Sequence, residues 1–239
     1  MAEQILHSVN IGIGIVSVLE RYERAKKLRE TIGVGSIVVD TNRNGSWFGT
    51  KEAWKLCSKE YTHFLVIEED VLVCKDFYET ITNAVSAVPD QLISFFNLRS
   101  DKRLNEWAVK NDSHWATLSA GTTGQAVLMP REMVYQFLLW ESKYINPKIP
   151  YEDTRLWAFM KKFSYKTFVT VPNVCEHGGA LTSALGFNNK GKVSYDFIGE
   201  NVSGKDIDWT KGIEKASAHS FANDWLGWSQ WFDGSKSFD

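Results

Sequence analysis

The chain has 239 residues, of which 44% are hydrophobic and 23% are charged. This composition is typical of a packed globular protein and excludes a disordered chain, which would lack the apolar residues needed for a core. The 27 basic and 29 acidic residues give a net charge of −2. Proteins that bind nucleic acid through many phosphates are usually basic. The net charge therefore disfavours a large DNA-binding surface, although it does not exclude a local basic patch.

The cysteines and the hydropathy pattern indicate the compartment. Cys57, Cys74 and Cys175 are too few and too scattered for a disulfide framework or a zinc cluster, and are typical of buried thiols in a reducing compartment. The N-terminus does not resemble a signal peptide, and no window is apolar over the length of a membrane span. We therefore expect a soluble, cytoplasmic protein without a membrane partner.

The first half of the chain alternates strand-like and helix-like segments. Apolar runs predict strands over residues 11–18, 36–40, 63–67 and 92–97, and amphipathic segments predict helices over 19–32, 49–60 and 77–88. Strands that alternate with helices form a mostly parallel sheet with helices on both faces. The predicted fold class is therefore α/β, with a Rossmann-like sheet.

The second half is less regular. Residues 99–119 are polar and predict loops, residues 125–129 and 166–171 predict strands, helices are expected from Pro130 and over 153–163, and 172–187 is a Gly-rich loop. No repeat or linker is evident, so we expect one domain, with a catalytic part over 1–190 and an irregular, aromatic-rich C-terminal segment over 191–239 packed on it. Four of the ten tryptophans lie between Trp209 and Trp231. Packing is the simpler interpretation, and a platform for a sugar or a base is the alternative.

Three consecutive carboxylates end the third predicted strand: Glu68, Glu69 and Asp70. In open α/β sheets, ligands bind at the carboxyl ends of strands. Hard divalent cations are often held there by one or two carboxylates together with substrate phosphates. The alternative is an acidic turn with solvated side chains.

Two further groups of residues could carry chemistry. Glu152 and Asp153 open a predicted helix, where the helix dipole favours acidic side chains and simple capping is the alternative. His177 follows the last predicted strand and precedes two glycines, which suggests close backbone approach to a ligand such as a phosphate.

The order of these features resembles the GT-A class of nucleotide-sugar glycosyltransferases, over about residues 11–186. In that class the helix after the first strand carries basic residues, here Arg21, and the second strand ends in an acidic residue that contacts the nucleoside, here Asp40. The resemblance implies that Asp70 binds the metal at an Asp-x-Asp-like motif. Glu68 or Glu69 stands in place of the first Asp of that motif.

The resemblance also implies roles for the later residues. A helix start supplies the catalytic base in inverting members, which would be Asp153 with Glu152 assisting. A histidine near the end of the core completes the metal or pyrophosphate site, which would be His177. The implied donor is a nucleoside-diphosphate sugar, and the implied cofactor is a divalent cation, Mn²⁺ or Mg²⁺. The cation would stabilise the leaving diphosphate, and the base would activate the acceptor hydroxyl.

Two other functions stay open, together with the acceptor. A nucleotidyltransferase would share the sheet and the metal carboxylates, but the Gly-rich basic loop typical of that class is missing after the first strand. A non-catalytic sugar-binding module could use the C-terminal tryptophans. The acceptor could be a hydroxymethylated base in DNA, as in the transferases of bacteriophages, or a protein or small glycan. For DNA, Lys192 and Lys211 are among the lysines that could meet phosphate.

Overall fold

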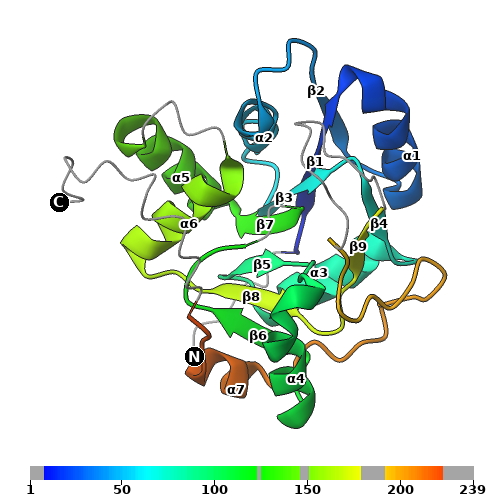
Figure 1. The fold of residues 1–239 in the computed structure, drawn as a ribbon, viewed down its shortest axis with the longest axis vertical. Helices are drawn as coiled ribbons and strands as arrows, with labels where there is room; N and C mark the ends of the chain where they lie inside the picture. Colours follow the sequence, from blue (N-terminus) through cyan, green and yellow to red (C-terminus); the bar gives the residue numbers. More distant parts are fainter. Residues whose placement is uncertain (1–7, 123–124, 146–150, 179–191, 223–239) are drawn as a thin grey trace.

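The computed structural model describes residues 8–122, 125–145, 151–178 and 192–222. A seven-stranded sheet has the order β2-β1-β3-β7-β5-β8-β6, and a smaller sheet pairs β4 with β9 (Figure 1). The strands are β1 (Ile11–Val18), β2 (Ser36–Asp40), β3 (His63–Glu68), β4 (Val71–Val73), β5 (Leu92–Ser94), β6 (Trp115–Leu118), β7 (Ala126–Pro130), β8 (Thr167–Thr170) and β9 (Cys175–His177). The helices are α1 (Tyr22–Ile32), α2 (Ser46–Trp54), α3 (Phe77–Ala87), α4 (Lys102–Lys110), α5 (Arg131–Tyr144), α6 (Glu152–Phe163) and α7 (Ile213–Ala218), with 3-10 turns at Leu19–Arg21 and Arg99–Asp101.

Five of the seven strands in the large sheet run in the same direction. The exceptions are β6 and β7, which pair antiparallel with their neighbours. This arrangement confirms the predicted α/β class with a mostly parallel sheet. Because β7 runs against β3, it begins at the edge where β3 ends, which brings the segment before β7 next to the strand-end carboxylates.

Helices cover both faces of the sheet, and each face has its own apolar core (Figure 1). One core contains the inner residues of α1, α3 and α7, and the other contains those of α2, α5 and α6. Strand β3 shows the alternation that produces this arrangement. Leu65 and Ile67 face the first core, whereas Phe64 and Val66 face the second.

Two glycines in β1 let the second layer approach the sheet closely. A Cβ at Gly12 would overlap the ring of Phe64, and one at Gly14 would lie 2.9 Å from the Cβ of Ala53 in α2. Both glycines lie inside the strand and not in the turn after it. Gly12 therefore makes room for the Phe64 ring of β3 and Gly14 for α2, and the pair is not the phosphate-binding turn of a dinucleotide fold.

The prediction of loops over residues 99–119 is wrong. This segment contains α4 and the edge strand β6, whose residues are all buried. The polar residues misled the prediction because α4 is amphipathic and buries only one face, on β6 and β8 through Leu104 and Ala108. The small sheet was also missed, since β4 and β9 have three residues each and form by pairing with one another.

The C-terminal part of the described chain packs on the body. Trp209 is buried in the first core, its ring centroid 5.3 Å from that of Trp115, and the Trp115 indole donates a 2.7 Å hydrogen bond to the Trp209 carbonyl. The packing interpretation therefore holds for Trp209. The other three C-terminal tryptophans, and the expected boundary between residues 190 and 191, lie outside the described residues.

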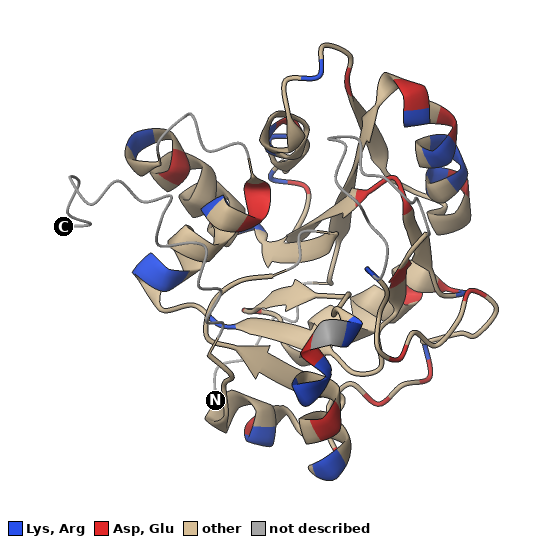
Figure 2. Ribbon diagram, viewed as in Figure 1, with Lys and Arg blue, Asp and Glu red and all other residues tan. Residues whose placement is uncertain are grey.

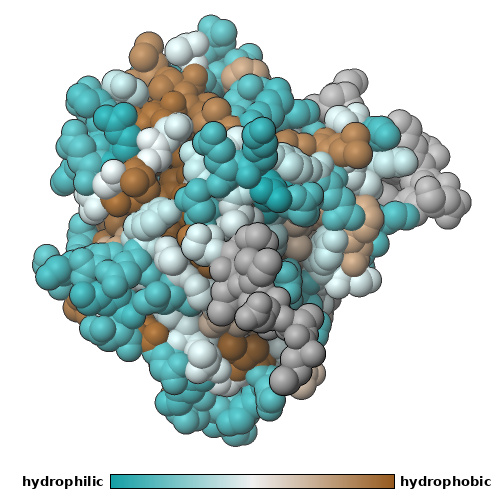
Figure 3. Space-filling model, turned by 180° about the vertical axis from the view of Figure 1, so that it is seen from behind, coloured by the Kyte–Doolittle hydropathy of each residue, from teal (hydrophilic) through white to brown (hydrophobic). Residues whose placement is uncertain are grey.

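The surface is mainly hydrophilic with scattered apolar side chains. Figure 3 shows the reverse face, where hydrophilic residues surround smaller hydrophobic areas. Single exposed apolar side chains such as Val109 and Leu139 are normal for a folded protein. Across the described residues, we find no helix that combines the length and apolar character needed to cross a membrane.

Candidate functional site

The strand-end carboxylates are held by Arg21. Glu68 is the last residue of β3, and Glu69 and Asp70 form the turn into β4 with only 9% and 7% of their surface exposed. Arg21 Nη1 lies 2.8 Å from Glu69 Oε1 and 3.3 Å from Asp70 Oδ2. Because β1 and β3 are parallel neighbours, the turn that follows β1 carries Arg21 to the end of β3. The guanidinium thus offsets part of the carboxylate repulsion, a role that the sequence had not indicated.

Asp70 and His177 meet where the two sheets adjoin. Pairing of β4 with β9 places Val71 opposite His177, and His177 Nε2 lies 3.5 Å from Asp70 Oδ2. The other carboxylate oxygen, Oδ1, is buried and has no hydrogen-bond partner among the described residues. Burial lowers the pKa of the His177 imidazole, which keeps the ring in the neutral form that can bind a metal.

These two side chains alone are too few to hold a metal ion. Within the ranges that the structure describes, no three His, Cys, Asp or Glu side chains are grouped to hold a metal ion by themselves. One buried carboxylate oxygen without a partner and one neutral imidazole nonetheless fit a cation that brings further oxygen ligands with it. Divalent cations bound through a nucleotide diphosphate have this character.

The start of α6 supplies two more carboxylates. Glu152 and Asp153 are its first two residues, both half-buried, and Asp153 Oδ1 accepts a 2.7 Å hydrogen bond from the Thr154 amide. Burial raises the pKa of the Asp153 carboxyl to about 7, and the negative charge of Glu152 adds to the shift. A helix start by itself favours the ionised form of Asp153, but here desolvation outweighs the dipole and the hydrogen bond.

Electrostatic coupling joins the two carboxylate groups. Burial raises the pKa of the Glu68 carboxyl well above its ordinary value, and the charges of Glu152 and Asp70 raise it further. The Lys192 ammonium acts in the opposite direction on both Glu68 and Asp153. Acidic segments at the end of β3 and the start of α6 lie on the same side of the sheet (Figure 2). The strand-end carboxylates and the carboxylates at the start of α6 are therefore near enough to influence one another electrostatically.

Asp40 closes β2 as predicted, but its carboxylate serves the loop that follows. Oδ1 accepts hydrogen bonds from the Asn42 amide (3.2 Å) and the Asn44 side chain (2.9 Å), and Oδ2 accepts one from the Gly45 amide (3.2 Å). Gly45 is the N-cap of α2, and its φ of 106° is one that glycine adopts without strain. Asp40 thus shapes the turn that follows the carboxyl end of β2.

Two residues that the sequence analysis had not assigned to the site also lie there. Lys192 had been noted only as a possible phosphate contact, and the fold places it beside the carboxylates. Gln125 precedes β7, and its carbonyl accepts a 2.9 Å hydrogen bond from the Glu68 amide. Its side-chain Oε1 is buried and has no hydrogen-bond partner in the described parts of the chain. No local pattern indicates Gln125, because the antiparallel pairing of β7 alone brings it to Glu68.

Comparison with known proteins adds little to this geometry. No family model matches the chain, and no curated protein matches it. Among solved structures, A197 from STIV is similar, with a TM-score of 0.47 and 11% sequence identity over 82% of this chain and 98% of that chain. A likeness at this level carries no functional conclusion, so the chemistry of the site must support any proposal.

Proposed function

We propose that this chain is a divalent-metal-dependent glycosyltransferase that moves a sugar from a nucleoside-diphosphate sugar to an acceptor hydroxyl. One observation carries the proposal: Asp70, which pairs with His177, and Glu152, which precedes Asp153, both raise the pKa of the Glu68 carboxyl, and the pKa of Asp153 itself is raised to about 7. Asp70 and His177 could hold a cation that binds the diphosphate of a donor. The Asp153 carboxylate could accept the proton of an acceptor hydroxyl.

The metal half of the proposal rests on the oxygen of Asp70 that lacks a partner. A buried carboxylate oxygen without a hydrogen bond is costly unless another group satisfies it. A divalent cation held by Asp70 and His177 would neutralise the charge that builds on the departing diphosphate. Arg21 already contacts Asp70, so it would lie beside the same phosphates and orient the carboxylate.

The base half rests on the environment of Asp153. Transfer forms a bond between the acceptor oxygen and the anomeric carbon, breaks the bond from that carbon to the diphosphate, and passes the hydroxyl proton to Asp153. A general base works best when its pKa lies near the working pH. Asp153 meets this condition because burial and the neighbouring Glu152 raise its pKa. A carboxylate base on the acceptor side favours inversion at the anomeric carbon.

The acceptor group is a hydroxyl, and experiment must identify the molecule that bears it. Hydroxymethylated DNA stays a candidate, but one of the lysines considered for phosphate binding, Lys211, is paired with Asp112 at 2.6 Å. The net charge of −2 also weighs against a large nucleic-acid footprint. A DNA duplex containing hydroxymethylated bases therefore belongs in the acceptor panel as one arm, beside peptides and small glycans.

The decisive experiment incubates the purified protein with a panel of nucleotide sugars and Mn²⁺ or Mg²⁺. Release of nucleoside diphosphate, lost in Asp70→Asn and kept in the surface variant Asp112→Asn, would support the proposal. Pyrophosphate release from a nucleoside triphosphate and a sugar phosphate would instead identify a nucleotidyltransferase. Sugar binding without any turnover would identify a binding module.

A further inference from the structure

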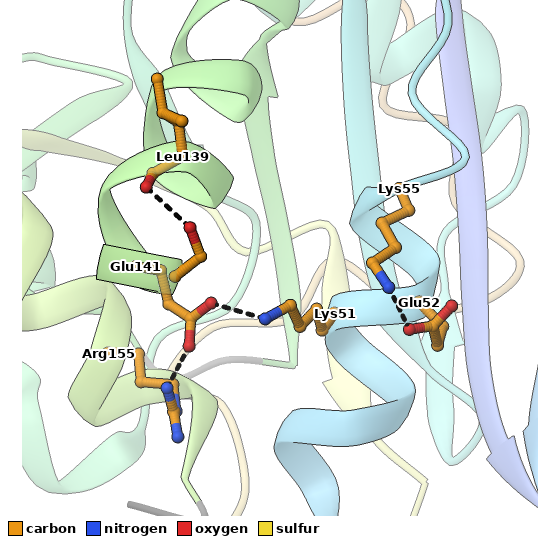
Figure 4. A network of polar contacts seen from close by, with 7 residues as sticks. Lys51, Glu52, Lys55, Leu139, Glu141 and Arg155 are labelled. Atoms are coloured by element: carbon orange, nitrogen blue, oxygen red, sulfur yellow. Dashed lines mark hydrogen bonds and ion pairs between the residues drawn. The ribbon is translucent and has the colours of Figure 1, made fainter. Parts of the chain in front are cut away.

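A buried ion pair lies behind the start of α6. Glu141 of α5 is 3% exposed and Arg155 of α6 is 1% exposed. Arg155 Nη1 donates a hydrogen bond to Glu141 Oε1, and Lys51 Nζ of α2 lies 2.8 Å from the other oxygen, Oε2 (Figure 4). One carboxylate thus joins three helices of the same layer.

An aromatic ring packs against the guanidinium of Arg155. Arg155 Cζ lies 4.9 Å from the centroid of the Trp47 ring in α2, and this ring packs edge-on against Phe137 of α5 at 5.7 Å. A planar guanidinium stacked on an aromatic face and hydrogen-bonded at its edge has little freedom to move. Arg155 is therefore held from two neighbouring helices at once.

Stability alone is a weak reason for such a pair. Replacing a buried ion pair with apolar side chains of similar volume is often neutral or stabilising, because the charges no longer have to be removed from water. The apolar residues around the pair, among them Trp47 and Phe137, would accept such a replacement. An apolar pair would not fix the relative orientation of the two side chains, whereas a charged hydrogen bond has a preferred geometry and does fix it.

The position of the first turn of α6 depends on such an anchor. Tyr151 occupies the N-cap, and the backbone hydrogen bond from the Arg155 amide to the Tyr151 carbonyl is long at 3.4 Å. Asp153 lies in this turn, two residues before Arg155. We infer that Glu141 and Arg155 are positioning residues, whose buried pair on Trp47 sets where the first turn of α6 carries Asp153.

This inference rests on the proposed function in one respect, namely that Asp153 is the catalytic base. The position of the carboxyl can be measured without any reaction, because its pKa depends on burial and on Glu152 and is opposed by Lys192 and the Thr154 amide. A first turn that loses its anchor would expose Asp153 to water. Exposure moves a raised carboxyl pKa back towards its ordinary value.

The experiment compares the double variant Glu141→Met/Arg155→Met with the wild type. Carbon-13 NMR follows the titration of the Asp153 carboxyl, assigned through Asp153→Asn, and thermal unfolding is recorded in parallel. We expect the melting temperature to be kept while the Asp153 midpoint falls by at least about one pH unit. We also expect kcat for sugar transfer to fall about tenfold or more while the donor KM stays within about twofold. Glu52→Gln, which breaks the exposed pair with Lys55 on α2, is the matched control and should change neither.

A second variant keeps the test decisive. Arg155→Lys retains the charge but loses the planar stack on Trp47, so it should also lower the Asp153 midpoint. A folded double variant with the wild-type midpoint and the wild-type kcat would overturn the inference. Failure of both variants to fold would also overturn it, because the pair would then serve stability. If the midpoint falls but the wild type transfers no sugar, the positioning role stands and the proposed function fails.

Discussion

His177 Nε2 lies 3.5 Å from Asp70 Oδ2 because the short strands β4 and β9 pair across the edge of the main sheet. The same oxygen of Asp70 lies 3.3 Å from Arg21 Nη1. Three segments that are distant in the sequence therefore converge on one carboxylate, whose second oxygen is buried without a hydrogen-bond partner among the described residues. This convergence leads to predictions about the metal, the base and the loops that hold them.

Asp70→Asn should abolish metal-stimulated donor turnover while the fold survives. The amide cannot supply the negative charge that a divalent cation requires, and Arg21 keeps Glu69 as a partner. Turnover measured with Mn²⁺, with Mg²⁺ and after chelation tests this, with the exposed Glu79→Gln as the control. Wild-type turnover in the presence of a chelator would contradict the metal assignment.

Asp153→Asn should lower transfer to the acceptor by at least about 10²-fold, because the amide cannot accept the hydroxyl proton. Donor affinity should stay near that of the wild type. In the wild-type protein the transfer rate should rise with pH through about 7, since the base must be ionised. Rate profiles from pH 5 to 9 check this. If Glu152→Gln removes transfer and Asp153→Asn does not, the roles of the two carboxylates are exchanged.

The raised pKa of Asp153 also predicts a pH dependence of stability. The folded protein binds the carboxyl proton more tightly than the unfolded chain, so this contribution is fully present below about pH 4 and is lost as the pH rises through about 7. Asp153→Asn carries no such charge. Its free energy of unfolding should therefore gain on that of the wild type between pH 5 and pH 8, by an amount on the order of 1–2 kcal/mol once solvent screening is allowed for, and its melting temperature should rise relative to the wild type over the same range. A constant difference across that range would show that Asp153 is an ordinary carboxyl.

Asp40→Ala should loosen the loop between β2 and α2. Three hydrogen bonds to the carboxylate are lost, including the one from the Gly45 amide at the start of α2. The expected loss in unfolding free energy is about 1–3 kcal/mol, and nucleoside diphosphates should bind more weakly. Calorimetry with Asp40→Asn separates the two effects, because the amide keeps one acceptor for the loop. Unchanged nucleotide affinity in both variants would remove Asp40 from the donor site.

Gly178→Ala should disturb the metal site without touching a ligand. A Cβ at this position would overlap the carbonyl oxygen of Asp70, which accepts a hydrogen bond from the Gly178 amide. The backbone must shift to relieve this overlap, and Asp70 and His177 shift with it. We expect metal affinity to weaken about tenfold, as for residues that orient metal ligands. Titration with Mn²⁺ measures the change, and wild-type affinity would show that the close approach is incidental.

The local sequence pattern was enough to predict much of the scaffold. Periodicity identified β1, β2, β3 and the helices between them, since burial on two faces demands continuous apolar strands and striped helices. The strand-end carboxylates and the acidic start of α6 were visible for the same reason, because strand and helix ends are local features. These elements confirm the α/β class that the sequence predicted.

What the sequence by itself determined is therefore the kind of elements and the residues at their ends. The tertiary structure alone decided which ends meet. The antiparallel course of β7 brought Gln125 to Glu68, the pairing of β4 with β9 brought His177 to Asp70, and the turn after β1 carried Arg21 to both acidic neighbours. It also decided the pKa of Asp153, which a helix start alone would lower and burial raises. The physical reason is that pairing and desolvation depend on groups distant in the chain, whereas periodicity and capping depend on neighbours.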